Sequence, residues 1–132
     1  MNQRQVVIYA RVSSEEQEKE GFSIPAQLKL LKEYAASEGY EIVSEFIDVE
    51  TAKTSGRTYF NELVKFLEKE GKSRRENRCR TVLVEKTDRL YRNLPDYARL
   101  DESGIEIHFV KEGVVLSAES NSSAKFMHGI KV

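Results

Sequence analysis

The chain has 132 residues, which is enough for one domain with its own core and too few for two domains of ordinary size. Its 21 Lys and Arg against 22 Asp and Glu give a formal net charge of −1, which excludes the overall basic bias of many nucleic-acid-binding domains, so any polyanion site must be local. One cysteine and no signal-peptide pattern predict a cytoplasmic protein without a disulfide framework.

The first apolar run, residues 6–12, predicts a buried parallel strand because it is continuous and rich in β-branched residues. Arg11 and Ser13 lie where this strand ends, and open α/β sheets place their chemistry at the carboxyl ends of strands. Ser14 is interpreted as a turn or capping residue. No apolar run approaches the length of a membrane span, so we expect no membrane partner.

The next elements alternate between helix and strand. Apolar residues at helical spacing predict a helix over 24–38, and a run rich in Ile, Val and Phe predicts a second strand over 40–48 that ends at Asp48. The small polar residues of 49–57 predict a mobile loop. A second amphipathic helix then ends near Gly71.

A basic connection, residues 72–80, follows this helix. We interpret it as a solvated loop rather than a DNA-contacting patch. It contains Cys79 between Arg78 and Arg80, which favour a lowered thiol pKa. Because no second cysteine or base accompanies Cys79, we interpret it as an incidental thiol.

A third strand over 81–85 leads into a charged turn over 86–93, so charge again collects where a strand ends. A short helix over 95–102 and a fourth strand over 105–110 follow. The next residues predict a turn at 111–113 and a short antiparallel edge strand at 114–116.

The last residues change character. A polar linker over 117–123 precedes a helical pattern over 124–132, which stops before three turns are complete. We therefore expect one domain over 1–123 and the start of a truncated helix over 124–132.

The order of these elements predicts an α/β fold: a mainly parallel, doubly wound sheet of four strands with a short antiparallel edge strand. If the first strand lies between the second and third, a crevice opens at the carboxyl ends. Ser13, Asp48 and residues 86–92 would converge there.

The chemistry of that crevice leaves three hypotheses. It would hold a hydroxyl, several arginines and acids but no histidine, which disfavours a Ser-His-Asp hydrolase. Guanidinium groups around the Ser13 hydroxyl suit phosphoryl transfer without a metal or cofactor. Alternatively, Asp48, Glu50 and Asp88 would hold Mg²⁺ in a metal-dependent nuclease or phosphatase. The third hypothesis is a non-catalytic, flavodoxin-like binding module.

Four blocks in order resemble the catalytic domain of the serine site-specific recombinases, which comprise resolvases, invertases and large serine integrases. The blocks are Tyr9-Ala10-Arg11-Val12-Ser13-Ser14, Gln27, Asp48 with Arg57, and Lys86-x-Asp88-Arg89-x-x-Arg92. The turn at 111–114, followed by Ser-Ser-x-Lys-Phe-Met, is most similar to the large integrase branch.

The resemblance implies a resolvase-like fold and a reaction on double-stranded DNA of the integration or excision type. Ser13 would attack a phosphodiester to form a 5′-phosphoserine intermediate, with double-strand cleavage, strand exchange and religation, and with no metal or cofactor. The residues implied to bind the phosphate are Arg11, Arg57, Lys86, Arg89 and Arg92.

The resemblance also implies supporting residues, which are Tyr9, Gln27, Asp48, Lys86 and Asp88. Asp88 would either handle the proton of the 3′-oxygen or orient Arg89, while Gln27 also fits a surface position on its helix. Thr51 stands where the family often has a serine, and Ser55 is an alternative for that role.

In this family the final helix continues into a long arm followed by DNA-binding domains. We therefore expect residues 1–132 alone to bind DNA weakly and not to recombine it. The resemblance further implies a homodimer on DNA, a tetramer in the synaptic complex, and a bacterial or phage mobile-element protein that is cytoplasmic and nucleoid-associated.

Overall fold

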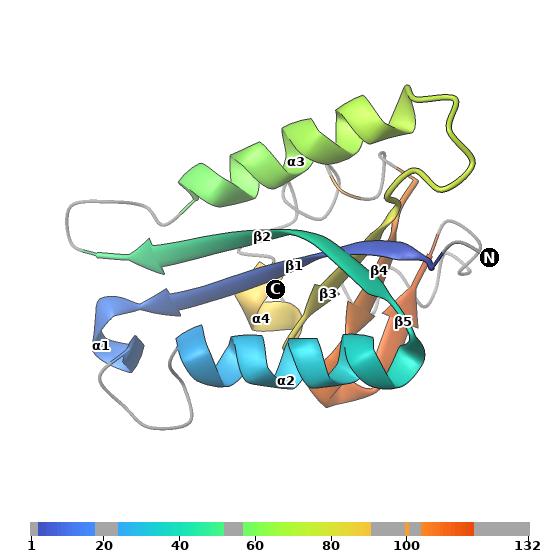
Figure 1. Cartoon of the computed structure of the whole chain (residues 1–132). Coiled ribbons are helices and arrows are strands. Elements are labelled where there is room, and N and C mark those ends of the chain that lie inside the picture. The colour runs from blue at the N-terminus through green and yellow to red at the C-terminus, as the bar shows by residue number, and fades with distance from the viewer. Residues whose placement is uncertain (1–2, 18–23, 52–56, 91–99, 101–103, 118–132) are drawn as a thin grey trace.

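A five-stranded sheet with the order β2-β1-β3-β4-β5 organises the chain (Figure 1). The computed structural model describes residues 3–17, 24–51, 57–90, 100 and 104–117. The strands are β1 (Gln5–Ser13), β2 (Glu41–Glu50), β3 (Thr81–Val84), β4 (Glu106–Phe109) and β5 (Val114–Leu116). β1 pairs in parallel with β2 and β3, β3 pairs in parallel with β4, and β5 is antiparallel to β4. This topology confirms the predicted α/β sheet.

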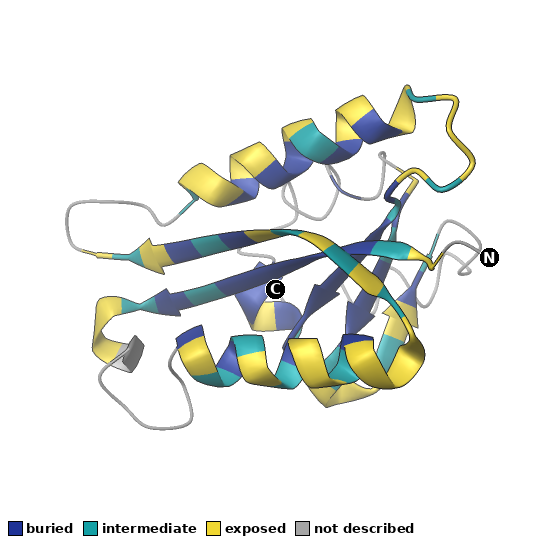
Figure 2. Cartoon of the chain, in the orientation of Figure 1, coloured by how far each residue is buried: buried dark blue, intermediate teal, exposed yellow. Residues whose placement is uncertain are grey.

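Helices lie on both faces of the sheet: α3 covers one face and α2 the other (Figure 1). The helical elements are α1 (Ser14–Gln17), α2 (Ile24–Glu38), α3 (Thr58–Gly71), α4 (Thr87–Leu90) and the 3₁₀ turn η1 (Val110–Glu112). In α2 and α3, buried residues recur at three- and four-residue spacing and face the sheet (Figure 2). None of the helices described is long and apolar enough to cross a membrane.

The core lies on both faces of the sheet, because β1 is buried on both. Val7 and Tyr9 belong to the larger cluster under α3, which also holds Phe60. Val6 and Ile8 pack on the opposite side with residues of α2. Side chains alternate along a strand, so the odd-numbered positions of β1 face α3 and the even-numbered ones face α2.

The strands around β1 differ in length, and one is irregular. β3 ends with Val84 opposite Tyr9, whereas β1 and β2 stay paired up to Ser13 and Glu50. β1 therefore extends four residues, about 13 Å, beyond the end of β3. The β1–β2 register also shifts by one residue between Val6 and Val7.

The observed bounds refine several predictions. The helix over 24–38 is confirmed, while β2 continues to Glu50 because its partner β1 also continues. The predicted turn at 111–113 is η1 followed by Gly113 in the left-handed conformation, with φ of 66°. Of the predicted helix over 95–102, only Leu100 is described, and the helical pattern over 124–132 lies outside the described residues.

Candidate active site

The carboxyl end of β1 presents Tyr9, Arg11 and Ser13 on its α3 face, because these are alternate residues of one strand. Their partners in β2 include Asp48, opposite Arg11, and Glu50, opposite Ser13. Ser13 is half-buried at the last position of β1, immediately before α1. The predicted nucleophile thus lies at the end of β1, two residues after Arg11 on the same face of the strand.

Asp48 ties β1, β2 and α3 together. Its Oδ2 accepts a hydrogen bond from the Tyr9 hydroxyl at 2.7 Å, and its two carboxylate oxygens accept from the amides of Tyr59 and Phe60 at 2.9 Å each. Those amides belong to the first turn of α3, which lacks intrahelical acceptors for them. Burial, followed by the bond to Asp48, raises the pKa of Tyr9 well above its ordinary value. Asp48 therefore acts on its neighbours in this structure rather than facing an open crevice.

Gln27 holds the backbone of β1 where β3 has ended. It is fully buried, its Oε1 accepts from the Arg11 amide at 3.2 Å, and its Nε2 donates to the Arg11 carbonyl at 3.1 Å. The carboxamide thus supplies one donor and one acceptor to a stretch of β1 that has no β3 partner. The alternative that Gln27 is a helix-surface residue is wrong.

Two arginines bind the carbonyl end of α4. Arg11 donates from Nε to the Arg89 carbonyl at 3.1 Å and from Nη2 to the Asp88 carbonyl. Arg57, at the start of α3, donates from Nη2 to the Leu90 carbonyl at 3.1 Å. A helix of one turn has no N–H groups of its own that could donate to these carbonyls. Positive charge is also favourable at the carbonyl end of a helix. The guanidinium of Arg57 also lies 3.8 Å from the centre of the Phe60 ring.

Arg89 is held from the other side by a buried acid. Its Nε donates to Glu85 Oε1 at 3.0 Å, and the two side chains are only 5% and 6% exposed. Asp88 is exposed on the same turn. Lys86 is half-buried just before this turn, and its carbonyl accepts a hydrogen bond from the Arg89 amide. The Lys86 to Arg89 segment is thus locked between Glu85 and Arg11.

The structure brings some predicted residues together and leaves others apart. Arg11, Arg57, Asp88 and Arg89 meet at α4, whereas Ser13 lies at the overhanging end of β1. Thr51 is exposed at the end of β2. Two other predicted positions, Arg92 and Ser55, fall outside the described residues.

The acid cluster required by the metal-dependent hypothesis does not form in the part of the chain that is described. No group of three or more His, Cys, Asp or Glu side chains there could hold a metal ion. Asp48 is engaged by Tyr9 and α3, and Glu50 lies 3.5 Å from Arg11 Nη1. The alternative is therefore not favoured.

Sequence reasoning missed two acids at this site, Glu85 and Glu112. Glu85 carried a weak signal, since it stands four residues before Arg89 at the end of an apolar strand. Glu112 Oε1 accepts from the amide of Thr87 at 3.0 Å and from its hydroxyl at 2.6 Å. Nothing in the spacing of these residues, 25 positions apart, indicates that contact.

The basic connection is organised by Glu70 of α3. The carboxylate of Glu70 accepts two bonds from Arg75 Nη2, at 2.7 and 3.0 Å, and one from the Cys79 amide at 2.9 Å. Burial raises the pKa of the Cys79 thiol, so the expected lowering by its arginine neighbours is wrong.

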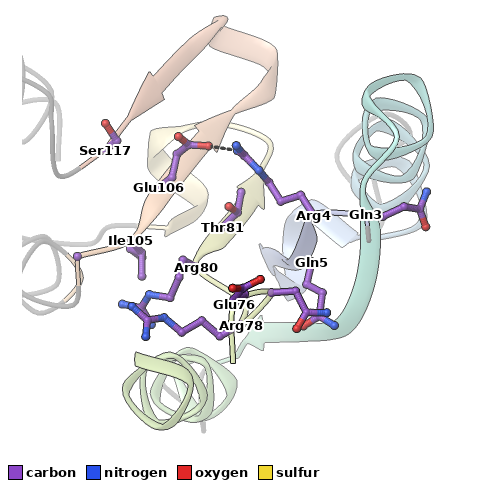
Figure 3. Close-up of a pocket in the computed structure, with 12 residues that line it drawn as sticks. Gln3, Arg4, Gln5, Glu76, Arg78, Arg80, Thr81, Ile105, Glu106 and Ser117 are labelled. Atoms are coloured by element: carbon purple, nitrogen blue, oxygen red, sulfur yellow. Dashed lines mark hydrogen bonds and ion pairs between the residues drawn. The ribbon is translucent and has the colours of Figure 1, made fainter. Parts of the chain in front are cut away.

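The opposite end of the sheet holds a polar cavity of about 540 Å³ at the amino ends of β1, β3 and β4 (Figure 3). Arg4 Nη1 contacts Glu106 Oε2 there at 2.6 Å, and the same oxygen lies 2.7 Å from His108 Nε2. Arg80 also lines the cavity and donates from Nη1 to the Leu67 carbonyl of α3 at 2.6 Å. Among the predicted site residues that the structure describes, none lines it.

Comparison with known proteins places the chain in a protein family. The family described as "Resolvase, N terminal domain" matches residues 6–131. The chain belongs to this family. The match confirms the family resemblance seen in the sequence.

Solved structures of related catalytic domains share the resolvase-like fold. The N-terminal catalytic domain of TP901-1 integrase is 26% identical, with a TM-score of 0.71 over 96% of this chain and 90% of that one. A resolvase family site-specific recombinase from Streptococcus pneumoniae is 25% identical, with a TM-score of 0.74 over 98% and 85%. The C-terminal catalytic domain of ISC1926 TnpA, an IS607-like serine recombinase, is 28% identical, with a TM-score of 0.62 over 80% and 70%.

One curated relative also matches. It is the uncharacterized immunity region protein 3 of Bacillus phage phi105, which is 51% identical over 45 residues. The match covers 34% of this chain and 55% of that protein, so the chain spans little more than half of the relative's length.

Proposed function

We propose that this chain is the catalytic domain of a serine site-specific DNA recombinase and that Ser13 is its nucleophile. The observation that carries the proposal is that Arg11 and Ser13 share one face at the carboxyl end of β1, with Arg11 bound to α4. Membership of the resolvase family supports it. So do neighbours named as an integrase catalytic domain, a site-specific recombinase and a serine recombinase.

In the proposed reaction, Ser13 Oγ attacks the phosphorus of a DNA phosphodiester and the bond to the 3′-oxygen breaks. The 5′-phosphate is then joined to the serine, the serine proton passes to a base, and the departing 3′-oxygen takes up a proton. The exposed carboxyl of Asp88 is the candidate for that second transfer, unless it only orients Arg89. Attack by a 3′-hydroxyl reverses these steps and reseals the strand, so the energy of the bond is conserved.

The arginines would stabilise the negative charge of the transition state, because their planar forks match phosphate oxygens and stay ionised. Holding Arg89 at Nε fixes the plane of its guanidinium. Arg11 has five N–H donors, and the bonds to the carbonyls of α4 use two of its three nitrogens. A phosphate would therefore use the remaining donors of Arg11 or replace a carbonyl. Arg57, Lys86 and Arg92 complete the proposed phosphate site.

The proposal extends to the assembly and to the location of the protein. A dimer on double-stranded DNA and a tetramer in the synaptic complex would place four such serines on two duplexes, which allows double-strand cleavage and exchange. The reaction would take place in the cytoplasm. Residues 1–123 would form the catalytic unit, with 124–132 starting the next helix.

Covalent trapping on DNA tests the proposal. The full protein that contains this chain would be incubated in EDTA with nicked duplexes of varied central sequence, so that a cleaved strand end is lost and the adduct accumulates. Mass spectrometry should find the nucleotide on Ser13. Ser13→Ala should abolish the adduct, whereas the matched control Ser14→Ala, at an exposed position, should retain it.

Two outcomes would contradict the proposal. Cleavage that strictly requires Mg²⁺ and leaves no adduct would favour the metal-dependent nuclease. Unchanged DNA-linked function after simultaneous replacement of Ser13 and Arg89 would favour a binding module.

A further inference from the structure

The α4 turn is too short to set its own position. It has four residues, Thr87–Leu90, and it carries Asp88 and Arg89. A single helical turn leaves its amides and carbonyls without intrahelical partners, and isolated turns are unstable in water. The orientation of Arg89 therefore depends on contacts that other elements make with this turn.

The connection between β4 and β5 holds the beginning of α4. Glu112 Oε1 accepts from the Thr87 amide at 3.0 Å and from the Thr87 hydroxyl at 2.6 Å. The neighbouring Lys111 amide donates to the Glu85 carbonyl at 2.9 Å. Thr87 is itself buried, with 1% of its surface exposed. Its hydroxyl is a donor to Glu112.

These contacts lie at the amino end of α4, whereas the arginines already described bind its carbonyl end. Arg11 binds the carbonyls of Asp88 and Arg89, Arg57 binds that of Leu90, and the side chain of Glu85 accepts from Arg89 Nε. The turn is thus fixed at its amino end by an acid from the sheet edge and at its carbonyl end by cations. Release of either end would let the guanidinium plane of Arg89 rotate away from its present direction.

We propose that Glu112 is a positioning residue: from the β4–β5 connection it fixes the amino end of α4 and thereby sets the orientation of Arg89 and Asp88 toward the scissile phosphate. This inference rests on the proposed function. Glu112 itself does not contact DNA in this proposal. A displacement of a catalytic group by about 1 Å can cost about 100-fold in rate, so a distant clamp of this kind is expected to control the chemical step.

The test compares Glu112→Ala, Glu112→Gln and the control Val115→Ala, whose side chain is 49% exposed on the same hairpin. In the full protein, Glu112→Ala should slow adduct formation at saturating DNA by about 10- to 100-fold, while DNA affinity stays within about twofold. Glu112→Gln keeps an acceptor oxygen for Thr87 and should recover the rate to within about threefold of the unchanged protein. Val115→Ala should leave the rate unchanged. If Glu112 had only a structural role, Glu112→Ala would lower thermal stability, but it would not slow adduct formation while leaving DNA affinity unchanged.

Amide hydrogen exchange gives a second readout that does not depend on the DNA reaction. The Thr87 amide should exchange at least tenfold faster in Glu112→Ala than in Val115→Ala. If the unchanged protein forms no adduct, the proposed function fails, and this exchange rate alone decides whether the clamp exists. Equal exchange in the two variants would overturn the clamp.

Other results would also overturn the inference. A folded Glu112→Ala protein whose adduct rate lies within twofold of Val115→Ala would do so. If Glu112→Ala does not fold, Thr87→Val replaces it, because that change removes the hydroxyl donor and keeps the shape. Thr87→Val should slow the adduct rate about three- to tenfold, and a rate equal to that of the unchanged protein would refute the positioning role.

Discussion

The two ends of the sheet both bring arginines and carboxylates together, but they hold them differently. At the carboxyl end, Arg89 and Glu85 are almost completely buried, and Arg11 is bound to backbone carbonyls. At the amino end, Arg4 pairs with Glu106 while 51% of the Arg4 side chain remains exposed. The cavity of about 540 Å³ lies at this second end, away from the family motifs.

This difference shows that concavity does not locate the candidate site in this fold. A pocket encloses a small ligand, whereas a DNA backbone is an extended surface that needs charged groups held in fixed directions. Fixed direction comes from burial and from multiple hydrogen bonds, and the carboxyl end has both. The comparison predicts that substitutions at the carboxyl end disturb the fold more than equivalent ones at the amino end or on the surface.

The largest effect is expected for Glu85→Ala. The change leaves the buried Arg89 guanidinium without its carboxylate partner, and breaking a buried pair in this way costs about 3–5 kcal/mol of unfolding free energy. Urea unfolding measures the loss. The control is Lys32→Ala, which breaks the exposed Lys32–Glu45 pair and should cost less than about 1 kcal/mol. Equal losses of unfolding free energy in Glu85→Ala and Lys32→Ala would contradict the expected difference between the buried and the exposed ion pair.

Asp48→Ala should have the next largest effect. It removes the acceptor of the buried Tyr9 hydroxyl and of two amides in the first turn of α3. The loss of a helix cap and of a buried acceptor predicts about 2–4 kcal/mol in chemical denaturation. Glu62→Ala, at an exposed position of the same helix, is the control. A loss for Asp48→Ala below about 0.5 kcal/mol would refute its role as the anchor of β1 and α3.

The loss of stability at alkaline pH should differ between the two ends, each of which has one tyrosine with a raised pKa. Tyr9 is at the carboxyl end, and the hydroxyl of Tyr34 of α2 lies 2.7 Å from Nδ1 of His108, the partner of Glu106 at the amino end. Burial is the main cause that raises the pKa of each phenol, and it raises that of Tyr9 far more. The folded state keeps these protons where the unfolded chain, with a pKa of about 10, loses them. Each neutral phenol therefore contributes stability that is present below about pH 10 and is lost as the pH rises further, by at most about 1.4 kcal/mol per pH unit.

The free energy of unfolding, measured between about pH 9 and 11, should show this loss of stability and its change in two variants. Tyr9→Phe should flatten the loss of stability above about pH 10. Tyr34→Phe should flatten it less, because the pKa of Tyr34 lies closer to the ordinary value. The opposite ranking would contradict the difference in burial between the two ends.

The smallest effect is expected for Arg4→Ala. Its ion pair with Glu106 is exposed to water, so its removal should cost less than about 1 kcal/mol. Repeating the measurement in about 1 M NaCl should reduce the difference further, because salt screens exposed charges. A loss above about 2 kcal/mol that persists in salt would show that the two ends are held in the same way.

Most of the fold was predictable because each main element carries a local signal. Continuous apolar runs marked β1 and β3, and helical spacing marked α2 with both of its bounds. The position of β1 between β2 and β3 was only a condition of the predicted crevice, and the strand order meets that condition. The length of β2 was not predictable from its own residues, since it depends on how far β1 continues beside it.

The candidate site was predictable only in part. The order of polar residues after each strand predicted that Ser13, Asp48 and residues 86–92 converge, whereas the structure brings Arg11 and Arg57 to α4 and leaves Ser13 apart. The family motif singled out Ser13. The support that Glu112 gives to α4 was not visible, because Glu112 acts through hydrogen bonds to the amide and hydroxyl of Thr87, which is distant in the sequence. Hydrophobic periodicity does not report such bonds, and a one-turn helix is too short to have a period.

The register shift between β1 and β2 gives the position of Asp48 a further meaning. Val6 pairs with Ile42 but Val7 pairs with Ser44, so Val43 is an extra residue in β2. With uninterrupted pairing from Ile42, the residue opposite Arg11 would be number 47, and the Asp48 carboxylate would point toward α2. The register of β2 against β1, as well as the sequence of β2, is therefore needed to give the Tyr9 hydroxyl its hydrogen-bond acceptor. An insertion or deletion between positions 44 and 48 would separate the two side chains while leaving both in the sequence.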